Sequence, residues 1–335
     1  MNVMNVLVAA GVMGAMGLIF GGVLSLIGRI FAVPENPLKT SIRQLLPGAN
    51  CGACGYAGCD AYASAVADGE AKVTLCPVGG DAVAQAVGDV MGIEPETQER
   101  MVAKILCKGD TDKCQIHSDY LGPMTCKNAL LAGQGDKACA NACLGLGDCQ
   151  VACPFGAIKM SDKRLAYVDE DLCVGCGLCV NSCPRDIIKL LSRDRAVHRT
   201  CSAMEKGKIV RDNCLAGCLG CGKCQRSCKF GAITMRENLP PKINAEKCVG
   251  CMQCADKCPT GAISSNDRLR KRAVIDHTSC IDCKKCDQAC QFAAITRDAQ
   301  GKHTVIDWDC TGCGECAKVC PKSCILIVPG VKYNR

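Results

Sequence analysis

The sequence predicts a multidomain chain with one N-terminal transmembrane helix, a small mainly helical four-cysteine domain and three repeated α+β modules. Three observations lead to this prediction: no charged side chain stands between Met1 and Gly28, 34 of the 335 residues are cysteine, and one cysteine spacing recurs through the second half of the chain. The expected segments are a transmembrane anchor (1–30), the four-cysteine domain (31–95), a connecting segment (96–135), module 1 (136–195), module 2 (196–268) and module 3 (269–335).

The cysteine content indicates metal ligation. A disulfide scaffold is typical of short secreted chains, whereas this chain is long and begins without a cleavable export signal. Aromatic residues are few, with 5 Phe, 5 Tyr and 1 Trp, so bound metal is expected to organise much of the interior. The formal charge of +7 does not predict nucleic-acid binding. Iron–sulfur clusters carrying about −2 each would make the assembled protein acidic.

The uncharged N-terminal stretch predicts a permanent membrane anchor, because it exceeds the roughly 20 apolar residues that cross a bilayer. A buried soluble helix is the alternative. Arg29, Lys39 and Arg43 follow the stretch, so we expect a single pass through the plasma membrane (the inner membrane of a two-membrane cell) with the N-terminus outside and the large domain in the cytoplasm. Small residues such as Gly14, Gly17 and Gly21 share one helix face and would allow close approach of partner helices.

The first cysteine group has the spacing C-x2-C-x4-C-x16-C, formed by Cys51, Cys54, Cys59 and Cys76. Its glycine-rich loop can wrap a [4Fe–4S] cluster with backbone N–H groups directed at sulfur. Zinc also accepts four thiolates, so this group alone does not exclude it. Alanine-rich stretches at 61–67 and 82–90 predict helices around the group.

The main argument is the repeat C-x2-C-x2-C-x3-C-P, which ends at Cys183, Cys258 and Cys320 and is preceded 30 residues upstream by a partner motif in each case. This is the signature of bacterial two-cluster ferredoxins, in which the fourth cysteine of one motif ligates the cluster of the other. A zinc site needs no such reciprocal pair. Short apolar runs after each fourth cysteine, and Ala273–Asp276 and Thr304–Asp307 before the next motif, predict strands.

Swapped ligation predicts six clusters in the three modules, and with the first group about seven [4Fe–4S] clusters in all. The expected ligand sets of module 1 are Cys139, Cys143, Cys149 and Cys183, and Cys173, Cys176, Cys179 and Cys153. Those of module 2 are Cys218, Cys221, Cys224 and Cys258, and Cys248, Cys251, Cys254 and Cys228. Those of module 3 are Cys280, Cys283, Cys286 and Cys320, and Cys310, Cys313, Cys316 and Cys290.

The first motif departs from the repeat. Leu146 stands where the other motifs have their second cysteine, and Cys139, four residues before Cys143, is expected to complete the set. The remaining cysteines are Cys107, Cys114, Cys126, Cys201, Cys214 and Cys324. Buried spare thiols are one reading of them, and an irregular eighth site using Cys107, Cys114 and Cys126 is the other. His117, His198, His277 and His303 fall outside every cysteine spacing, which argues against Rieske-type ligation.

No dinucleotide or phosphate-binding fingerprint occurs, so we expect no NAD or flavin site in this chain. No catalytic residues stand out either, which leaves one-electron transfer as the expected chemistry. The basic run from Arg268 to Arg272 is either a solvated loop or a docking site for an acidic electron carrier.

Together, the uncharged anchor, the Cys51 group, the stretch from Cys139 to Cys149 and the repeated tail resemble the B subunit of the Rnf complex, a membrane-bound ion-translocating ferredoxin:NAD+ oxidoreductase, in a long polyferredoxin form. The resemblance implies a subunit of a translocase that accepts electrons from soluble ferredoxin and relays them to flavin and NAD subunits, coupled to Na+ or H+ transport. It implies other Rnf subunits and the bilayer as partners, and no nucleic acid. A polyferredoxin serving another membrane complex, such as a hydrogenase, and an activating partner in a corrinoid system are the alternatives.

Overall fold

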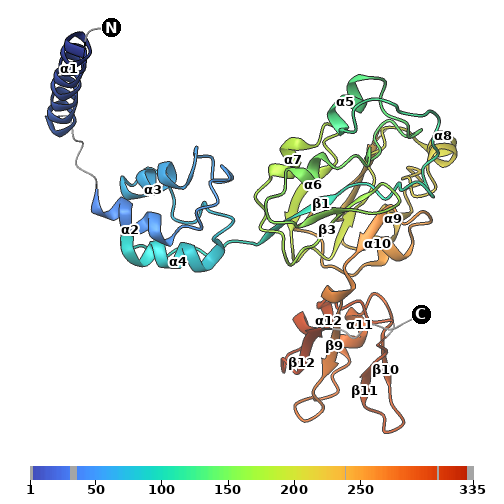
Figure 1. Cartoon of the computed structure of the whole chain (residues 1–335). Coiled ribbons are helices and arrows are strands. Elements are labelled where there is room, and N and C mark those ends of the chain that lie inside the picture. Colours follow the sequence, from blue (N-terminus) through green and yellow to red (C-terminus); the bar gives the residue numbers. More distant parts are fainter. Residues whose placement is uncertain (1–2, 31–35, 238, 308, 330–335) are drawn as a thin grey trace.

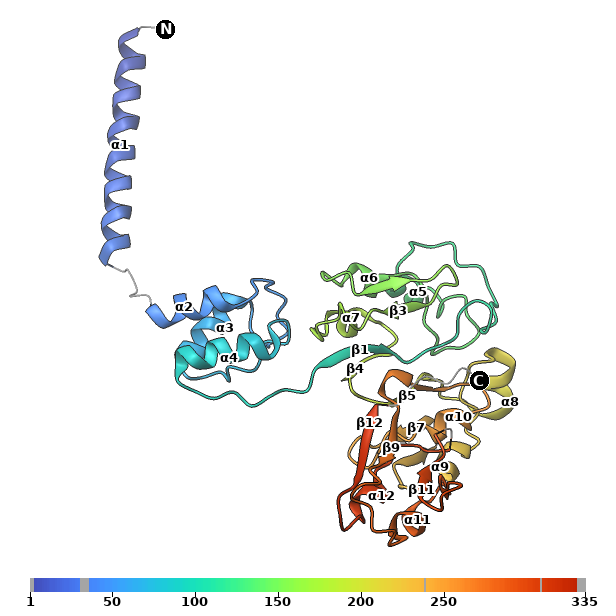
Figure 2. The same cartoon turned by 90° about the horizontal axis from the view of Figure 1, so that it is seen from below.

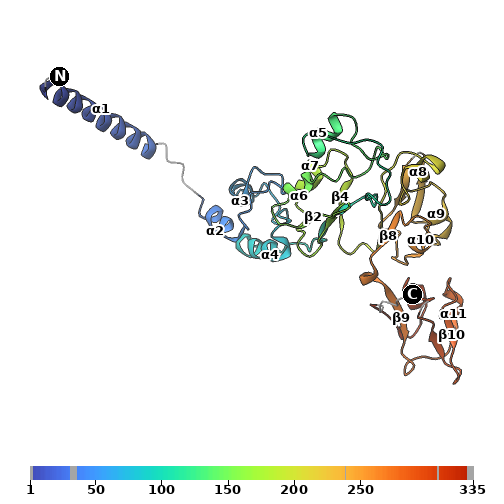
Figure 3. The ribbon, with the colours of Figure 1, turned by 45° about the vertical axis from the view of Figure 1, so that its right-hand side comes forward.

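The structure is a computed structural model that describes residues 3–30, 36–237, 239–307 and 309–329, without the side chains of residues 3–10 and 28–30. Helix α1 (Val3–Ile30) stands apart from the rest of the chain in all three views (Figures 1, 2 and 3). The side chains of residues 11–27 are all exposed. Within the described residues, no helix meets the combined length and hydropathy that a membrane crossing requires. Residues 1–2 of the expected anchor and the side chain of Arg29 lie outside the described part.

The four-cysteine domain consists of α2 (Pro37–Leu45), α3 (Cys59–Ala67) and α4 (Gly80–Met91), so both helices expected from the alanine-rich stretches are confirmed. Asn36 caps α2 by accepting a hydrogen bond from the Leu38 N–H, and Pro37 occupies the first turn, where its missing N–H costs nothing. The core of the domain is small: Ile42, Tyr62 and Val87 are at most 1% exposed.

Each of the three modules contains two antiparallel strand pairs, an outer pair formed by the first and last strands and an inner hairpin (Figure 1). In module 1 the strands are β1 (Met101–Ile105), β2 (Ile158–Met160), β3 (Ala166–Val168) and β4 (Ile188–Ser192). In module 2 they are β5 (Val197–Arg199), β6 (Ile233–Arg236), β7 (Leu239–Ile243) and β8 (Ile263–Ser265). In module 3 they are β9 (Lys271–Ile275), β10 (Ile295–Arg297), β11 (His303–Val305) and β12 (Ile325–Pro329). The strands expected after the fourth cysteines, and those expected at Ala273–Asp276 and Thr304–Asp307, are therefore present.

Short helices lie between the strands. Module 1 has α5 (Cys126–Leu131), α6 (Asp148–Val151) and α7 (Leu178–Ser182). Module 2 has α8 (Gly207–Asn213), α9 (Lys223–Ser227) and α10 (Gln253–Asp256). Module 3 has α11 (Lys285–Ala289) and α12 (Glu315–Lys318), and the 3-10 turn Asp267–Leu269 leads into it.

The segment 96–135 is more than the connection expected from the sequence. Its strand β1 pairs with β4, with Met101 opposite Ser192 and Ile105 opposite Ile188. This outer pair matches β5 with β8 in module 2 and β9 with β12 in module 3. Module 1 therefore begins near residue 100, and the cysteine spacing alone placed its start too late because β1 lies far upstream of the first motif.

Modules 2 and 3 contact each other through residues that follow equivalent cysteines. The rings of Phe230 and Phe292 lie 6.5 Å apart between centroids, and the Lys229 ammonium lies 4.8 Å from the Phe292 ring centroid. An aromatic pair with a cation over one ring gives this contact about 1–2 kcal/mol beyond area burial.

Candidate iron–sulfur cluster sites

The loop around the second cysteine of each repeated motif has the same left-handed backbone turns. Gly175 and Gly177 flank Cys176 with φ of 71° and 80°. The equivalent pairs are Gly220 and Gly222, Gly250 and Met252, Asp282 and Lys284, and Gly312 and Gly314. These turns wind the chain around a central space and lead into a short helix whose first turn carries the third cysteine, which is buried in every module. Glycine predominates because a side chain at positive φ costs about 1–2 kcal/mol.

Three sets of four expected ligands each line one cavity. Cys280, Cys283, Cys286 and Cys320 line a cavity of about 340 Å³, which His303 also borders. Cys290, Cys310, Cys313 and Cys316 line a cavity of about 340 Å³. Cys228, Cys248, Cys251 and Cys254 line one of about 330 Å³. In each case the fourth cysteine comes from the partner motif, so the swapped arrangement brings together the residues that the sequence pattern pairs.

The thiols of two further sets also lie close to one another. Burial raises the pKa of Cys179 to about 11, with smaller contributions from the nearby charges of Cys173, Cys176 and Cys153. Burial also raises the pKa of Cys218 to about 11, and Cys224 and Cys258 lie close enough to contribute. Cys221 lies near Cys224 and completes that set. Four thiols crowded at close range are unfavourable as separate anions, and metal binding removes that repulsion.

Near the irregular motif of module 1 lies a thiol that the cysteine spacing did not assign to it. Burial raises the pKa of Cys149 to about 12, and the thiols that act on it are Cys143, Cys126, Cys183 and Cys179. Cys126 is the first residue of α5, and its backbone N–H donates to the Asp148 carboxylate at 2.9 Å, which holds it beside the motif. Cys139 instead lies near Cys114 and Cys201.

In the four-cysteine domain, Cys54, Cys59 and Cys76 lie near one another, and all three pack against the core that contains Tyr62. Burial raises the pKa of Tyr62 to about 12, and its hydroxyl donates to the Lys72 carbonyl at 2.9 Å. Cys51 lies close enough to module 1 for its charge to act on Cys176. The first cysteine group and module 1 are therefore neighbours.

Backbone N–H groups donate to the sulfurs of several expected ligands. Ala103 donates to Cys173 at 3.4 Å, and Ala273 in the equivalent strand of module 3 donates to Cys310 at 3.3 Å. Ala232 and Ala294 donate to Cys228 and Cys290, each at 3.3 Å. Hydrogen bonds of this kind stabilise thiolate and raise the reduction potential of a bound cluster.

Of the cysteines without a place in the regular motifs, Cys126 joins the Cys143 set and Cys324 lies 3.4 Å from Cys320, sulfur to sulfur. Cys107, Cys139, Cys201 and Cys214 line a separate cavity. Sequence spacing did not group Cys107, Cys201 and Cys214 with Cys139. In the described residues, no three Cys, His, Asp or Glu side chains converge on a position for a single metal ion.

Models of three protein families match the chain. One, described as a putative Fe-S cluster, matches residues 46–78. Two described as 4Fe-4S dicluster domains match residues 138–190 and 273–327, and residues 217–263. A chain of the formate dehydrogenase, heterodisulfide reductase and formylmethanofuran dehydrogenase complex from Methanospirillum hungatei matches 55% of this chain and 72% of its own length, with 22% identity and a TM-score of 0.25, too low to carry an argument.

Curated relatives match at higher identity. The B subunit of the Na(+)-translocating ferredoxin:NAD(+) oxidoreductase complex of Acetobacterium woodii is 40% identical over 72% of this chain and 72% of its own length. The B subunit of the ion-translocating oxidoreductase complex of Methanosarcina acetivorans is 41% identical over 70% of this chain and 89% of its own length. The B subunit of the proton-translocating ferredoxin:NAD(+) oxidoreductase complex of Clostridium ljungdahlii is 40% identical over 68% and 81%. On this evidence the chain belongs to the family of B subunits of ion-translocating ferredoxin:NAD(+) oxidoreductases, the Rnf complexes.

Proposed function

We propose that the chain is the electron-transfer subunit of an Rnf complex, which takes electrons from reduced ferredoxin and delivers them toward subunits that carry flavin and the NAD site. The gathering of cysteine thiols in fours carries this proposal, because four thiolates are the ligand set of a [4Fe–4S] cluster. The relatives' names supply the donor and the acceptor, and the coupled ion is Na+ in one relative and H+ in another.

About seven clusters are proposed, with Cys126 in place of Cys139 in the first set of module 1. The thiol chemistry fits [4Fe–4S] clusters, which supply one-electron oxidation and reduction when bound. The proposed ligands are Cys51, Cys54, Cys59 and Cys76; Cys126, Cys143, Cys149 and Cys183; and Cys153, Cys173, Cys176 and Cys179. The others are Cys218, Cys221, Cys224 and Cys258; Cys228, Cys248, Cys251 and Cys254; Cys280, Cys283, Cys286 and Cys320; and Cys290, Cys310, Cys313 and Cys316.

The residues of the chain set how readily each site is reduced. Burial of the third cysteine of each motif keeps water from one side of the site, while the N–H groups of residues such as Ala103 and Ala273 stabilise negative charge on sulfur. Module 3 is proposed as the part that meets ferredoxin, because it is farthest along the chain from α1.

The N-terminal helix is proposed as a single-pass membrane anchor. In its favour, no charged residue occurs from Met1 to Gly28. Apolar side chains of the helix are also left exposed by the rest of the described chain, such as Leu18 (80% exposed) and Phe20 (60%). Arg29, Lys39 and Arg43 favour the cytoplasmic side for the large domain.

Anaerobic mixing of the purified chain with reduced ferredoxin tests the proposal. We expect the brown absorbance of the chain to decrease after mixing as its clusters are reduced. Low-temperature spin-resonance signals of reduced [4Fe–4S] clusters should appear at the same time. The complex purified through this chain should contain flavin-bearing and NAD-binding subunits. A chain that binds its clusters yet stays oxidised with reduced ferredoxin, or that co-purifies with a nickel protein, would contradict the Rnf function.

A further inference from the structure

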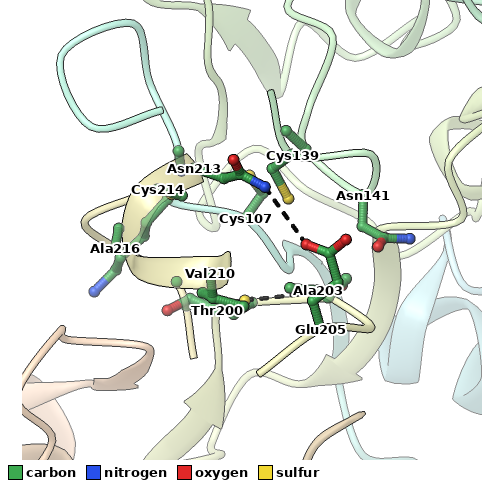
Figure 4. Close-up of a pocket in the computed structure, with 16 residues that line it drawn as sticks. Cys107, Cys139, Asn141, Thr200, Ala203, Glu205, Val210, Asn213, Cys214 and Ala216 are labelled. Carbon is green, nitrogen blue, oxygen red and sulfur yellow. Dashed lines mark hydrogen bonds between the residues drawn. The ribbon is translucent and has the colours of Figure 1, made fainter. Parts of the chain in front are cut away.

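The cavity between modules 1 and 2 has four cysteine thiols in its wall that belong to no regular motif. Cys107, Cys139, Cys201 and Cys214 line it together with Glu205 and Asn213, and its volume is about 400 Å³ (Figure 4). The cavities of the regular sets measure about 330–340 Å³. Cys201 and Cys214 are buried, at 7% and 8% exposure, and Cys107 and Cys139 are partly buried.

The four thiols form two pairs of equivalent positions, and each pair has one member in module 1 and one in module 2. Cys107 follows β1 by two residues and Cys201 follows β5 by two residues. The residue before each of them donates its N–H to the chain leading into the last strand of its module, Leu106 to Ile187 at 2.7 Å and Thr200 to Ala262 at 2.8 Å.

The second pair is equivalent in the same way, because Cys139 and Cys214 each stand four residues before the first cysteine of a motif, Cys143 and Cys218. The repeated architecture thus supplies two thiols from each side of the boundary between the modules. Module 3 has His277 at the position of Cys107 and Cys201.

The sulfurs have the hydrogen-bond environment of cluster ligands. Each accepts from the backbone N–H two residues further along, from Gly109, Asn141, Ala203 and Ala216 respectively. The regular ligands Cys176, Cys218 and Cys251 accept from the N–H two residues on in the same way. Cys114, whose thiol contacts that of Cys214, accepts from the N–H of Cys139.

Buried positive charge lies beside these thiols. Lys137 is 2% exposed, and its ammonium donates to the carbonyls of Gly109 and Arg164, each at 2.9 Å. Its charge acts on Cys107 and Cys114. The buried Asp136 carboxylate acts on the same charge, and a cluster with four thiolates, carrying about −2, would stabilise the buried ammonium further.

We propose that Cys107, Cys139, Cys201 and Cys214 hold an additional four-thiolate iron–sulfur cluster at the boundary of modules 1 and 2. The site lies between two proposed clusters: the Cys107 sulfur accepts from the Cys143 N–H at 3.4 Å, and the Cys201 sulfur accepts from the Cys218 N–H at 3.2 Å.

This site fills a gap in the series of thiol sets. Cys51 lies near Cys176, Cys179 near Cys149, Cys224 near Cys254, and Cys251 near Cys313. Within module 3, Cys286 and Cys316 belong to one buried cluster, so the other five steps between neighbouring sets are already close. The additional cluster joins the half of the series next to α1 to the half that includes module 3. Its oxidised form would accept one electron from a reduced neighbouring cluster and return it to the next oxidised one, with no net change at the site.

The proposal rests on the cluster content proposed above, and iron counting separates the two. The anaerobically purified full-length chain should contain about 32 iron and 32 sulfide per chain, and about 28 of each in the double variant Cys139→Ala/Cys201→Ala. Cys114→Ala, which removes a thiol outside the cavity wall, should keep the wild-type content. In quantitative Mössbauer spectra, the double variant should lack the signal of one cluster relative to the wild-type chain, and the signals of the other clusters should be unchanged.

Several outcomes would overturn the additional site. A wild-type chain saturating at about 28 iron would leave seven clusters and remove the eighth, whatever the variants do. A double variant with wild-type iron content, or a loss of about four iron in Cys114→Ala but not in Cys107→Ala, would show that these four thiols are not the ligand set. A wild-type chain without iron would refute the proposed function itself.

Discussion

Gly312 packs directly against the backbone of Lys271: a Cβ atom built on Gly312 would lie 2.3 Å from the Lys271 carbonyl oxygen. Gly175 has the same relationship to Met101 in module 1, at 2.5 Å. The outer strand of the module therefore lies against the loop that carries the second cysteine, and only glycine fits between them. Strand pairing and ligand position are thereby coupled in modules 1 and 3.

Gly312→Ala should prevent the Cys310 loop from closing, because the new methyl group meets backbone rather than a flexible side chain and the φ of 63° is already unfavourable. We expect loss of about four iron per chain and a fall of several kcal/mol in the stability of module 3. Gly314→Ala is the matched control, with a φ of 83° but its nearest contact at 3.9 Å. Equal iron loss in the two variants would show that positive φ, and not the contact with Lys271, is decisive.

Cys126→Ala should remove one cluster from module 1, because Cys126 is the thiol that the structure brings to Cys143, Cys149 and Cys183. Iron and sulfide should fall by about four each, with one spin-resonance signal lost. Cys114→Ala is the control, since Cys114 is also outside the regular motifs and belongs to no proposed ligand set. Unchanged iron content in Cys126→Ala would show that Cys126 is not a ligand and would favour Cys139 as the fourth ligand of this set.

Phe292→Ala should loosen the contact between modules 2 and 3, because the ring of Phe230 and the ammonium of Lys229 both lose the Phe292 ring as their partner. The expected cost to the docking of module 3 is about 1–3 kcal/mol. Limited proteolysis should cut faster within residues 266–270. Phe155→Ala changes the equivalent residue after Cys153 in module 1 and should leave that cleavage rate unchanged; a similar rise in both variants would show a general loss of stability.

Leu18→Arg should weaken membrane attachment, because an arginine at the middle of a transmembrane helix costs about 2.5–3.5 kcal/mol. The fraction of the chain in carbonate-washed membranes should fall, while Leu18→Ile leaves it unchanged and both variants keep wild-type iron. Full membrane retention of Leu18→Arg, or a soluble wild-type chain, would contradict the proposed anchor.

The cysteine repeat predicted the modules well because ligation fixes both spacing and backbone: the left-handed residues around Cys176 and the short helix that carries Cys179 recur wherever the spacing does. The repeat did not predict the tertiary contacts. Cys126 is held beside its set by the carboxylate of Asp148, 22 residues away, and β1 pairs with β4, the last strand of module 1, on the far side of both cysteine motifs. Neither contact leaves a local pattern. The pairing of Cys107 with Cys201 is equally hidden, since it follows from the symmetry of two modules and not from spacing.

The central claim is that the thiols of this chain hold iron–sulfur clusters that relay electrons, and metal analysis of the anaerobically purified full-length chain tests it most directly. Iron and acid-labile sulfide should be equal at no fewer than about 28 per chain, with low-temperature spin resonance after reduction accounting for at least seven [4Fe–4S] clusters. A colourless preparation, or one in which zinc is the main metal, would contradict the account.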